Sequence, residues 1–283
     1  MRLTVRHATT YAYDPPADRC ALRLRLYPPS FTSQRVLSWK VSVNGQAVPA
    51  LMTTATGDKE SIWTKSNVGE EVLVLAEGEV EVDDTAGVVR GLRDGIRPQV
   101  FLRPTPLTEA DEKIEKLAAS IADAAPLEQM HSLFNAVADA IEYKPATTTS
   151  TTTAAQALKA GQGVCQDHAH VFISAARTLK VPARYVVGYL FAPDAKLAET
   201  HAWAEAWVKD IGWVGFDAAN RLCPTDHYVR LGCGLDAVDA APIRGNVFGS
   251  RQERLSASVD IGTSTGQSQT QNQGDGVQSQ TQQ

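Results

Sequence analysis

The chain has 283 residues, which is enough for two domains with buried cores. Hydrophobic residues make up 43% and charged residues 21%, an ordinary composition for a soluble globular protein. The net charge of −5 argues against a nucleic-acid partner, and no apolar run approaches the ~20 residues of a membrane span. We therefore expect neither nucleic acid nor a membrane as a partner.

The first residues and the cysteines indicate a compartment. The opening stretch "MRLTVRHATTYAYD" has no apolar signal-peptide segment and is typical of a β-strand. The four cysteines, Cys20, Cys165, Cys223 and Cys233, form no CxxC pair, and scattered cysteines are usually free thiols in a reducing compartment. We therefore expect a cytoplasmic protein.

Residues 1–85 are expected to form an N-terminal antiparallel β domain. Apolar and polar residues alternate in "ALRLRLYP", "RVLSWKVSVNG" and "EEVLVLAEGEVEV", as in sheets with one buried face. Asn44 and Gly45 predict a type I′ hairpin turn. A small sandwich is the expected architecture. Residues 86–107 are rich in Gly and Pro, which predicts a linker.

Residues 108–262 are expected to form an α+β core, in which helices precede an antiparallel sheet. Four helices are predicted. The first begins at Thr108, with Asp111 three residues on, and the second runs from about Leu127 to Ile141. The third is a short helix capped by Thr153, and the fourth covers about residues 165–180. The stretches "ARYVVGYL", "THAWAEAWV" and "GWVGFDAA" then predict three strands. Residues 263–283 are almost entirely polar or glycine, which predicts a disordered tail.

Cys165 is the first candidate for chemistry. It follows the glycine turn "GQGV" and opens the predicted helix 165–180, where free backbone N–H groups and the helix dipole favour a thiolate. Taken alone, a buried structural cysteine is about as good an interpretation. A thiolate nucleophile also needs a nearby base, and that base needs an orienting group.

The two histidines beside Cys165 fit the role of base poorly. At about 100° per helical residue, His168 lies one turn deeper and could support the site, whereas His170 lies on another face of the helix. Neither has an obvious carboxylate partner nearby. We interpret His170 as a structural residue.

His201 and Asp217 are better candidates because they lie on adjacent predicted strands. In an antiparallel pair, the numbers of any two residues that lie opposite each other have the same sum. His201 and Asp217 share a face of the sheet if this sum is 418 or 420, which requires a hairpin loop with an odd number of residues. A sum of 421 would place them on opposite faces. Together with Cys165, the pair favours a catalytic interpretation over a hydrogen-bonded strand histidine and a turn aspartate.

A zinc site is the main chemical alternative. Cys165, His168, His170 and His201 are residue types that bind zinc. However, C-x₂-H-x-H is not a usual structural-zinc spacing, and no second Cys/His pair completes it. We therefore expect no metal and no other cofactor.

The order of these motifs resembles a known family. "GVCQDHAHVFISAARTLKVPARYVVGY", "THAWAEAWV" and "GWVGFDAAN" are similar to the bacterial transglutaminase-like family, within the papain-like cysteine-enzyme superfamily. The similarity covers about residues 100–250. The N-terminal stretch "MRLTVRHATTYAYDPPADRCALRLRLYPPS" also resembles the β domain that precedes this core in such proteins.

The resemblance implies a papain-like core with a catalytic triad of Cys165, His201 and Asp217. It also implies attack of the cysteine on an amide carbonyl to form a thioester. The backbone N–H of Cys165 would be one oxyanion donor, and Tyr143 is the candidate for the second. The family pattern Asp-Pro-Thr-Asn appears here as "DAAN", so the aspartate and asparagine remain while the proline and threonine do not.

Three functions fit these residues. The first is a cysteine-dependent amide hydrolase, a peptidase or amidase acting on a peptide or protein substrate. The second is a protein-glutamine transglutaminase, which would also need an amine site that the sequence does not reveal. The third is a non-catalytic interaction module that retains the fold. We expect the hydrolase, because water is always available as the acyl acceptor.

Overall fold

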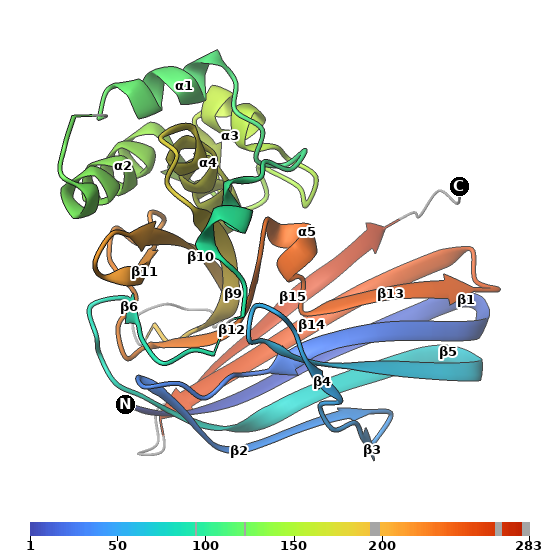
Figure 1. Cartoon of the computed structure of the whole chain (residues 1–283). Coiled ribbons are helices and arrows are strands. Elements are labelled where there is room, and N and C mark those ends of the chain that lie inside the picture. The colour runs from blue at the N-terminus through green and yellow to red at the C-terminus, as the bar shows by residue number, and fades with distance from the viewer. Residues whose placement is uncertain (94, 122, 193–198, 264–267, 279–283) are drawn as a thin grey trace.

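The computed structural model describes residues 1–93, 95–121, 123–192, 199–263 and 268–278. Figure 1 shows helices α1 to α4 grouped at one end of the molecule and the long strands of a large sheet at the other, with a smaller sheet between them. Within the described residues, no helix has the length and apolar character needed to cross a membrane. The arrangement confirms the expected α+β class, with an N-terminal antiparallel sheet and a helix-covered core.

The large sheet has eight strands and is antiparallel throughout. Its main order is β15-β14-β1-β5-β2-β3, with β13 paired to β1 and β4 paired to β5. The strands are β1 (Arg2–Tyr27), β2 (Gln34–Val43), β3 (Gln46–Ala47), β4 (Met52–Thr53), β5 (Lys59–Val82), β13 (Ile243–Phe248), β14 (Gln252–Thr263) and β15 (Ser268–Gln278).

The alternation in the sequence determines which face of this sheet is buried. Along β1, Leu3, Val5, His7, Thr9 and Tyr11 are all buried, and the residues between them are more exposed. This period of two follows from the strand pleat. Asn44 and Gly45 both have positive φ, and Val43 pairs with Gln46, so the predicted hairpin turn is confirmed.

The expected small sandwich is wrong. The N-terminal strands form one sheet, and four side chains of the smaller sheet complete its hydrophobic core: Tyr189, Phe191, Val229 and Leu231. The two halves of the protein therefore share a core. Local strand patterns could not predict this, because alternation reveals a buried face but not what covers it.

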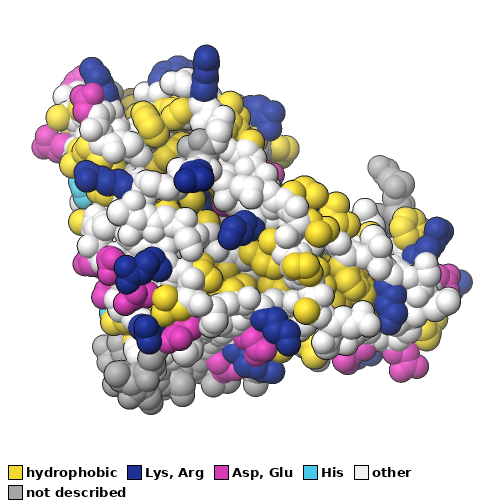
Figure 2. Space-filling view, turned by 60° about the horizontal axis from the view of Figure 1, so that its bottom comes forward, with side chains coloured by type: hydrophobic (Ala, Val, Ile, Leu, Met, Phe, Trp, Pro, Cys, Tyr) yellow, Lys and Arg dark blue, Asp and Glu magenta, His cyan; other side chains and the backbone are white. Residues whose placement is uncertain are grey.

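The outer surface on the side of the large sheet carries hydrophobic side chains. Figure 2 shows them gathered over the middle of that face, with charged side chains distributed around them. Leu37 of β2, Met52 of β4 and Ile62 of β5 are among the exposed large apolar residues. Exposed apolar residues of this kind are common on folded proteins.

The second sheet is antiparallel, with the order β12-β9-β10-β11-β6. Its strands are β6 (Val88–Val89), β9 (Ala183–Leu190), β10 (Glu199–Val208), β11 (Gly212–Phe216) and β12 (Tyr228–Gly234). The helices are η1 (Pro98–Leu102, a 3-10 helix), α1 (Glu112–Ala119), α2 (Pro126–Ala140), α3 (Ala154–Ala160), α4 (Cys165–Thr178) and α5 (Ala237–Ala240). A short parallel pair joins β7 (Glu142–Tyr143) to β8 (Gln162–Gly163).

The helix starts were predicted with mixed success. Thr153 and Gln156 form the capping box of α3. The first helix begins at Glu112 rather than Thr108, because the Asp111 carboxylate caps it by accepting from the N–H of Ile114 at 3.0 Å.

Two expected boundaries differ from the structure. The core was expected to extend to residue 262, but β13 and β14 return to pair with β1, so the chain leaves the core near Pro242. The expected disordered tail also does not hold for residues 268–278, which form β15 beside β14. Backbone groups on the β14 edge can pair with any suitably placed chain, and polar composition does not report this. Residues 264–267 and 279–283 lie outside the described residues.

The expected linker is also partly structural. Residues 86–107 include β6, which adds to the second sheet by pairing Val88 with Val214 and Val89 with Trp213. The 3-10 helix η1 buries Phe101 against Trp213, with ring centroids 5.3 Å apart. The segment therefore contributes to the core as well as connecting the two parts.

Candidate active site

Helix α4 begins at Cys165, as its sequence pattern predicts. The Asp167 carboxylate accepts from the N–H of Val164 at 2.8 Å and from the Thr148 hydroxyl at 2.7 Å, which ties the first turn to the preceding loop. Gly163 is required here, because a Cβ at that position would lie 2.7 Å from the Asp167 side chain. The turn thus places the half-buried Cys165 thiol at the helix N-terminus.

The thiol opens onto a cleft of about 330 Å³. One wall comes from Tyr143 and the start of α4, and the floor comes from β9 and β10, including Tyr185 and His201. Cys165 is therefore accessible, unlike the buried Cys20 and Cys233.

The strand register brings His201 and Asp217 together. Ala204 pairs with Phe216 and Trp207 with Trp213, so paired numbers sum to 420, one of the two values that place His201 and Asp217 on one face. Nε2 of His201 lies 2.6 Å from Oδ2 of Asp217. Cys165 and His201 line the same cleft, and hydrogen bonding with Cys165 is among the influences that raise the pKa of His201.

Two further side chains hold Asp217 in place. Tyr228 of β12 donates its hydroxyl to Oδ2 of Asp217 at 2.7 Å, and the Asn220 side-chain amide donates to the same oxygen at 2.7 Å. Asn220 belongs to the "DAAN" stretch, so its presence near Asp217 was expected. Tyr228 was missed, because β12 reaches the site only through its pairing with β9.

Electrostatics favour a charged pair of His201 and Asp217. Burial by itself would lower the pKa of His201, but the charge of Asp217 and the interactions with Asp217 and Cys165 outweigh it and raise the pKa to about 10. Burial would raise the pKa of Asp217, and the His201 charge and hydrogen bonds hold it below its ordinary value instead. At neutral pH the ring is therefore an imidazolium that can stabilise a thiolate.

The two histidines near Cys165 have structural partners. His168 lies between two backbone carbonyls, with Nδ1 2.9 Å from that of Val164 and Nε2 3.0 Å from that of Ile141, so it ties the first turn of α4 to the end of α2. His170 accepts from the N–H of Ala237 at 3.1 Å, and burial lowers its pKa to about 4. His168 therefore supports the turn, and His170 holds α5 against the core.

The four residues considered for zinc do not form one cluster, although Cys165 and His201 share the cleft. Among the described residues, no three His, Cys, Asp or Glu side chains gather in a way that could hold a metal ion. His168 contacts carbonyl oxygens and His170 contacts a backbone N–H, as given above.

Family models match both parts of the chain. The model described as the transglutaminase-like superfamily matches residues 115–218, which include Cys165, His201 and Asp217. The model described as the bacterial transglutaminase-like N-terminal region matches residues 3–81, within the large sheet. The chain therefore contains a transglutaminase-like core.

Similar proteins extend over nearly the whole chain. An uncharacterized protein of Mycobacterium leprae, ML0607, is 28% identical, with 92% of this chain and 98% of that protein covered. An uncharacterized protein of Mycobacterium tuberculosis, Rv2569c, is 27% identical, with 92% of each covered. A crystal structure of a candidate cysteine protease from Cytophaga hutchinsonii matches with a TM-score of 0.71 and 20% identity, covering 96% of this chain and 98% of that one. This last similarity shows the fold.

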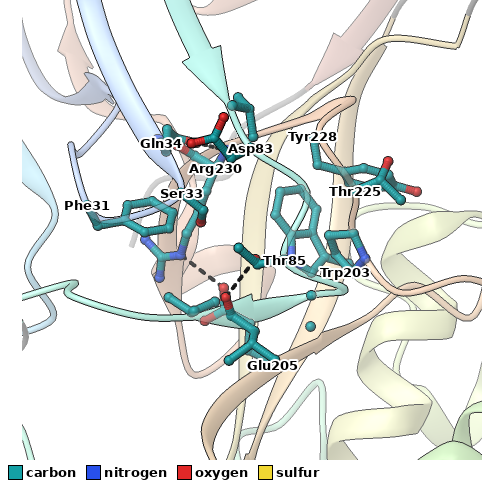
Figure 3. A pocket seen from close by; sticks show the side chains of 16 residues that line it. Phe31, Ser33, Gln34, Asp83, Thr85, Trp203, Glu205, Thr225, Tyr228 and Arg230 are labelled. Carbon is teal, nitrogen blue, oxygen red and sulfur yellow. Dashed lines mark hydrogen bonds and ion pairs between the residues drawn. The ribbon is translucent and has the colours of Figure 1, made fainter. Parts of the chain in front are cut away.

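A buried ion network lies behind the site of this transglutaminase-like core. Glu205 lies four residues along β10 from His201. Its carboxylate accepts hydrogen bonds from Nε of Arg184 at 2.6 Å and from Nε of Arg230 at 3.0 Å. Arg230 also donates to Asp58 of the large sheet's β4–β5 connection at 3.1 Å. Figure 3 shows Arg230 reaching Glu205 beside Trp203, at the junction of the two sheets. The network therefore fixes β10 and joins the two parts of the protein.

Replacing Glu205 with alanine should destabilise the fold strongly. Glu205 is 1% exposed, and the charges of both arginines overcome the effect of burial and hold its pKa below the ordinary value. Its removal leaves Arg184 and Arg230 buried with too little negative charge, which costs about 3–5 kcal/mol. Urea unfolding at pH 7 measures the loss. Glu112→Ala, which removes an exposed pair with Lys116, is the control and should change stability little. A loss below about 1 kcal/mol for Glu205→Ala would contradict the assigned role.

Proposed function

We propose that the protein is a cysteine-dependent amide hydrolase, a peptidase or amidase, with Cys165, His201 and Asp217 as its catalytic triad. The observation that carries this proposal is that Cys165 and His201 line one cleft while His201 contacts the Asp217 carboxylate at 2.6 Å. A nucleophile, a base within reach and an oriented carboxylate are the three parts that acyl transfer needs. A non-catalytic module has no need for this geometry.

The first half of the reaction forms an acyl-enzyme. The Cys165 thiolate attacks the amide carbonyl carbon, and the carbonyl oxygen takes the negative charge. The C–N bond then breaks as His201 gives its proton to the leaving amine. Asp217 keeps the ring oriented and stabilises its positive charge.

The second half releases the product. His201, now neutral, accepts a proton from water, and the resulting hydroxide attacks the thioester carbonyl. The C–S bond breaks, the acid leaves, and the thiolate–imidazolium pair is restored. An amine in place of water would give the transglutaminase reaction. We propose hydrolysis because the open cleft admits water and nothing assigns an amine site.

The oxyanion would be stabilised beside Cys165. The backbone N–H of Cys165 is at the first turn of α4, where such groups have no partner inside the helix. Tyr143 lines the same cleft, on β7 next to the glycine turn, and is the proposed second donor. The parallel pairing of Tyr143 with Gly163 fixes its distance from the start of α4.

A product assay distinguishes the candidate functions. Purified protein is incubated with a panel of peptides and glutamine-containing proteins, with and without a primary amine, and products are identified by mass spectrometry. We expect new carboxylates (a mass gain of water) that require Cys165, with amine adducts as a minor product. Predominant amine adducts would indicate a transglutaminase. No Cys165-dependent product, together with no iodoacetamide labelling of Cys165, would contradict an enzyme of this class.

A further inference from the structure

A second cavity shares one lining residue, Thr200, with the Cys165 cleft. This cavity has a volume of about 170 Å³. Thr200, which directly precedes His201 on β10, lines both the Cys165 cleft and the second cavity. The second cavity therefore borders the Cys165 cleft at the start of β10, on the side of the large sheet.

The large sheet supplies one wall of this cavity. Three cross-strand pairs of β1 and β14 lie on one face, namely His7 with Val259, Thr9 with Ala257, and Tyr11 with Leu255. Residues directly opposite in an antiparallel pair put their side chains on the same side of the sheet. Pro242 and Ile243, where the chain leaves the core, close the cavity from another direction. The cavity is therefore built by both parts of the protein.

The lining accepts apolar groups and disfavours charged ones. No Asp, Glu, Lys or Arg is among the described residues that line it. The ring nitrogens of His7, the one histidine in the lining, are 3.1 Å from the Tyr189 hydroxyl and 3.1 Å from the Thr9 hydroxyl, so both have partners. Burial lowers the pKa of His7 to about 4, so the ring is neutral at pH 7. A charged side chain would lose its hydration there without gaining a counter-charge.

We propose that this cavity is a substrate specificity subsite, which binds a large apolar side chain of the peptide whose carbonyl reacts with Cys165. An apolar cavity of about 150 Å³ holds a benzene ring, so the volume suits a leucine, methionine or phenylalanine side chain. The N-terminal sheet then has a defined task, which is to select the acyl part of the substrate. This inference rests on the proposed function, because it assumes a covalent reaction at Cys165.

The test measures alkylation of Cys165 by peptide probes. A chloromethyl ketone, which loses chloride as the thiol sulfur forms the new C–S bond, replaces the C-terminal carboxylate of a glycine tetrapeptide, and leucine replaces each glycine in turn. We expect one position at which leucine raises the second-order rate about tenfold or more over glycine, as expected for burial of one apolar side chain. Lysine or glutamate at that position should give no increase. Iodoacetamide, which is too small to reach the cavity, reports the reactivity of the thiol alone.

Two variants locate the effect. Ala257→Trp fills the cavity and should abolish the leucine preference. Ser258→Trp on the opposite face of β14 is the matched control and should keep the preference. Leu255→Ala enlarges the cavity without adding bulk and should shift the preference from leucine to phenylalanine. Circular dichroism verifies that each variant is folded.

The outcomes separate this inference from the function on which it rests. A uniform rate at every position, or a leucine preference that survives Ala257→Trp and is unchanged in Leu255→Ala, would overturn the subsite while leaving Cys165 as the nucleophile. Failure of iodoacetamide and of every peptide probe to modify Cys165 in the wild-type protein would instead overturn the proposed function.

Discussion

Replacing Cys165 with alanine should lower kcat/KM for amide hydrolysis by about 10⁴-fold or more, because the variant has no atom that can form the thioester. Removal of a nucleophile disables the remaining groups of a triad as well, since His201 and Asp217 act only through it. The structure leaves the rest of the cleft intact in this variant, so substrate binding should persist. Steady-state kinetics on the best peptide found in the product assay measures the change.

Cys223 provides the matched control for this experiment. It is also a half-buried free thiol, but burial and the Asp217 charge raise its pKa to about 11, so it is a poor nucleophile at neutral pH. Cys223→Ala should retain activity, and iodoacetamide at pH 7 should modify Cys165 well before Cys223. Activity that survives Cys165→Ala but not Cys223→Ala would show that the wrong thiol has been assigned.

Replacing Asp217 with asparagine should lower kcat/KM by about 10²–10⁴-fold and change the pH profile. The Asp217 charge is the largest of the influences that raise the pKa of His201 to about 10. In the wild-type protein, activity should therefore fall as pH rises through about 10, where His201 loses the proton that the leaving amine needs. Without the carboxylate this alkaline limb should move to lower pH. A pH series of kcat/KM for both proteins measures the shift.

The same ionisation predicts the direction of a stability change. The pKa of His201 is raised on folding from an ordinary 6.5 to about 10, so its pairing stabilises the fold fully below pH 6.5. That contribution is lost as pH rises through about 10.

Tyr228→Phe removes one hydroxyl donor to Asp217 and leaves the charge. It should move the alkaline limb of the kcat/KM profile less than Asp217→Asn does. An unchanged limb in Asp217→Asn would show that Asp217 does not control the protonation of His201.

Several features of the fold were predictable because local physics determines them. The alternation along β1 predicts the buried face, and the positive φ values at Asn44 and Gly45 follow from a two-residue hairpin. The start of α4 at Cys165 follows from the glycine turn before it. Only two strand registers, with paired residue numbers that sum to 418 or 420, place His201 and Asp217 on one face, and the structure adopts the second.

Other features depend on contacts between distant segments. The single large sheet, the return of β13 and β14 to β1, and the pairing of β15 all arise from backbone hydrogen bonds that carry no sequence signature. Tyr228 reaches Asp217 because β12 pairs with β9. Local patterns cannot report such neighbours.

The sequence by itself determined which residues are candidates for nucleophile, base and orienting carboxylate, because short segments specify their types and local settings. Only the tertiary structure decided their distances, the hydrogen bonds around Asp217 and the ion network behind β10. It also decided that alternate residues of 7–11 and 255–259 line one cavity together with Thr200. The physical reason is that a site built at the junction of two sheets is defined by pairing register and packing, and both are set by the whole chain.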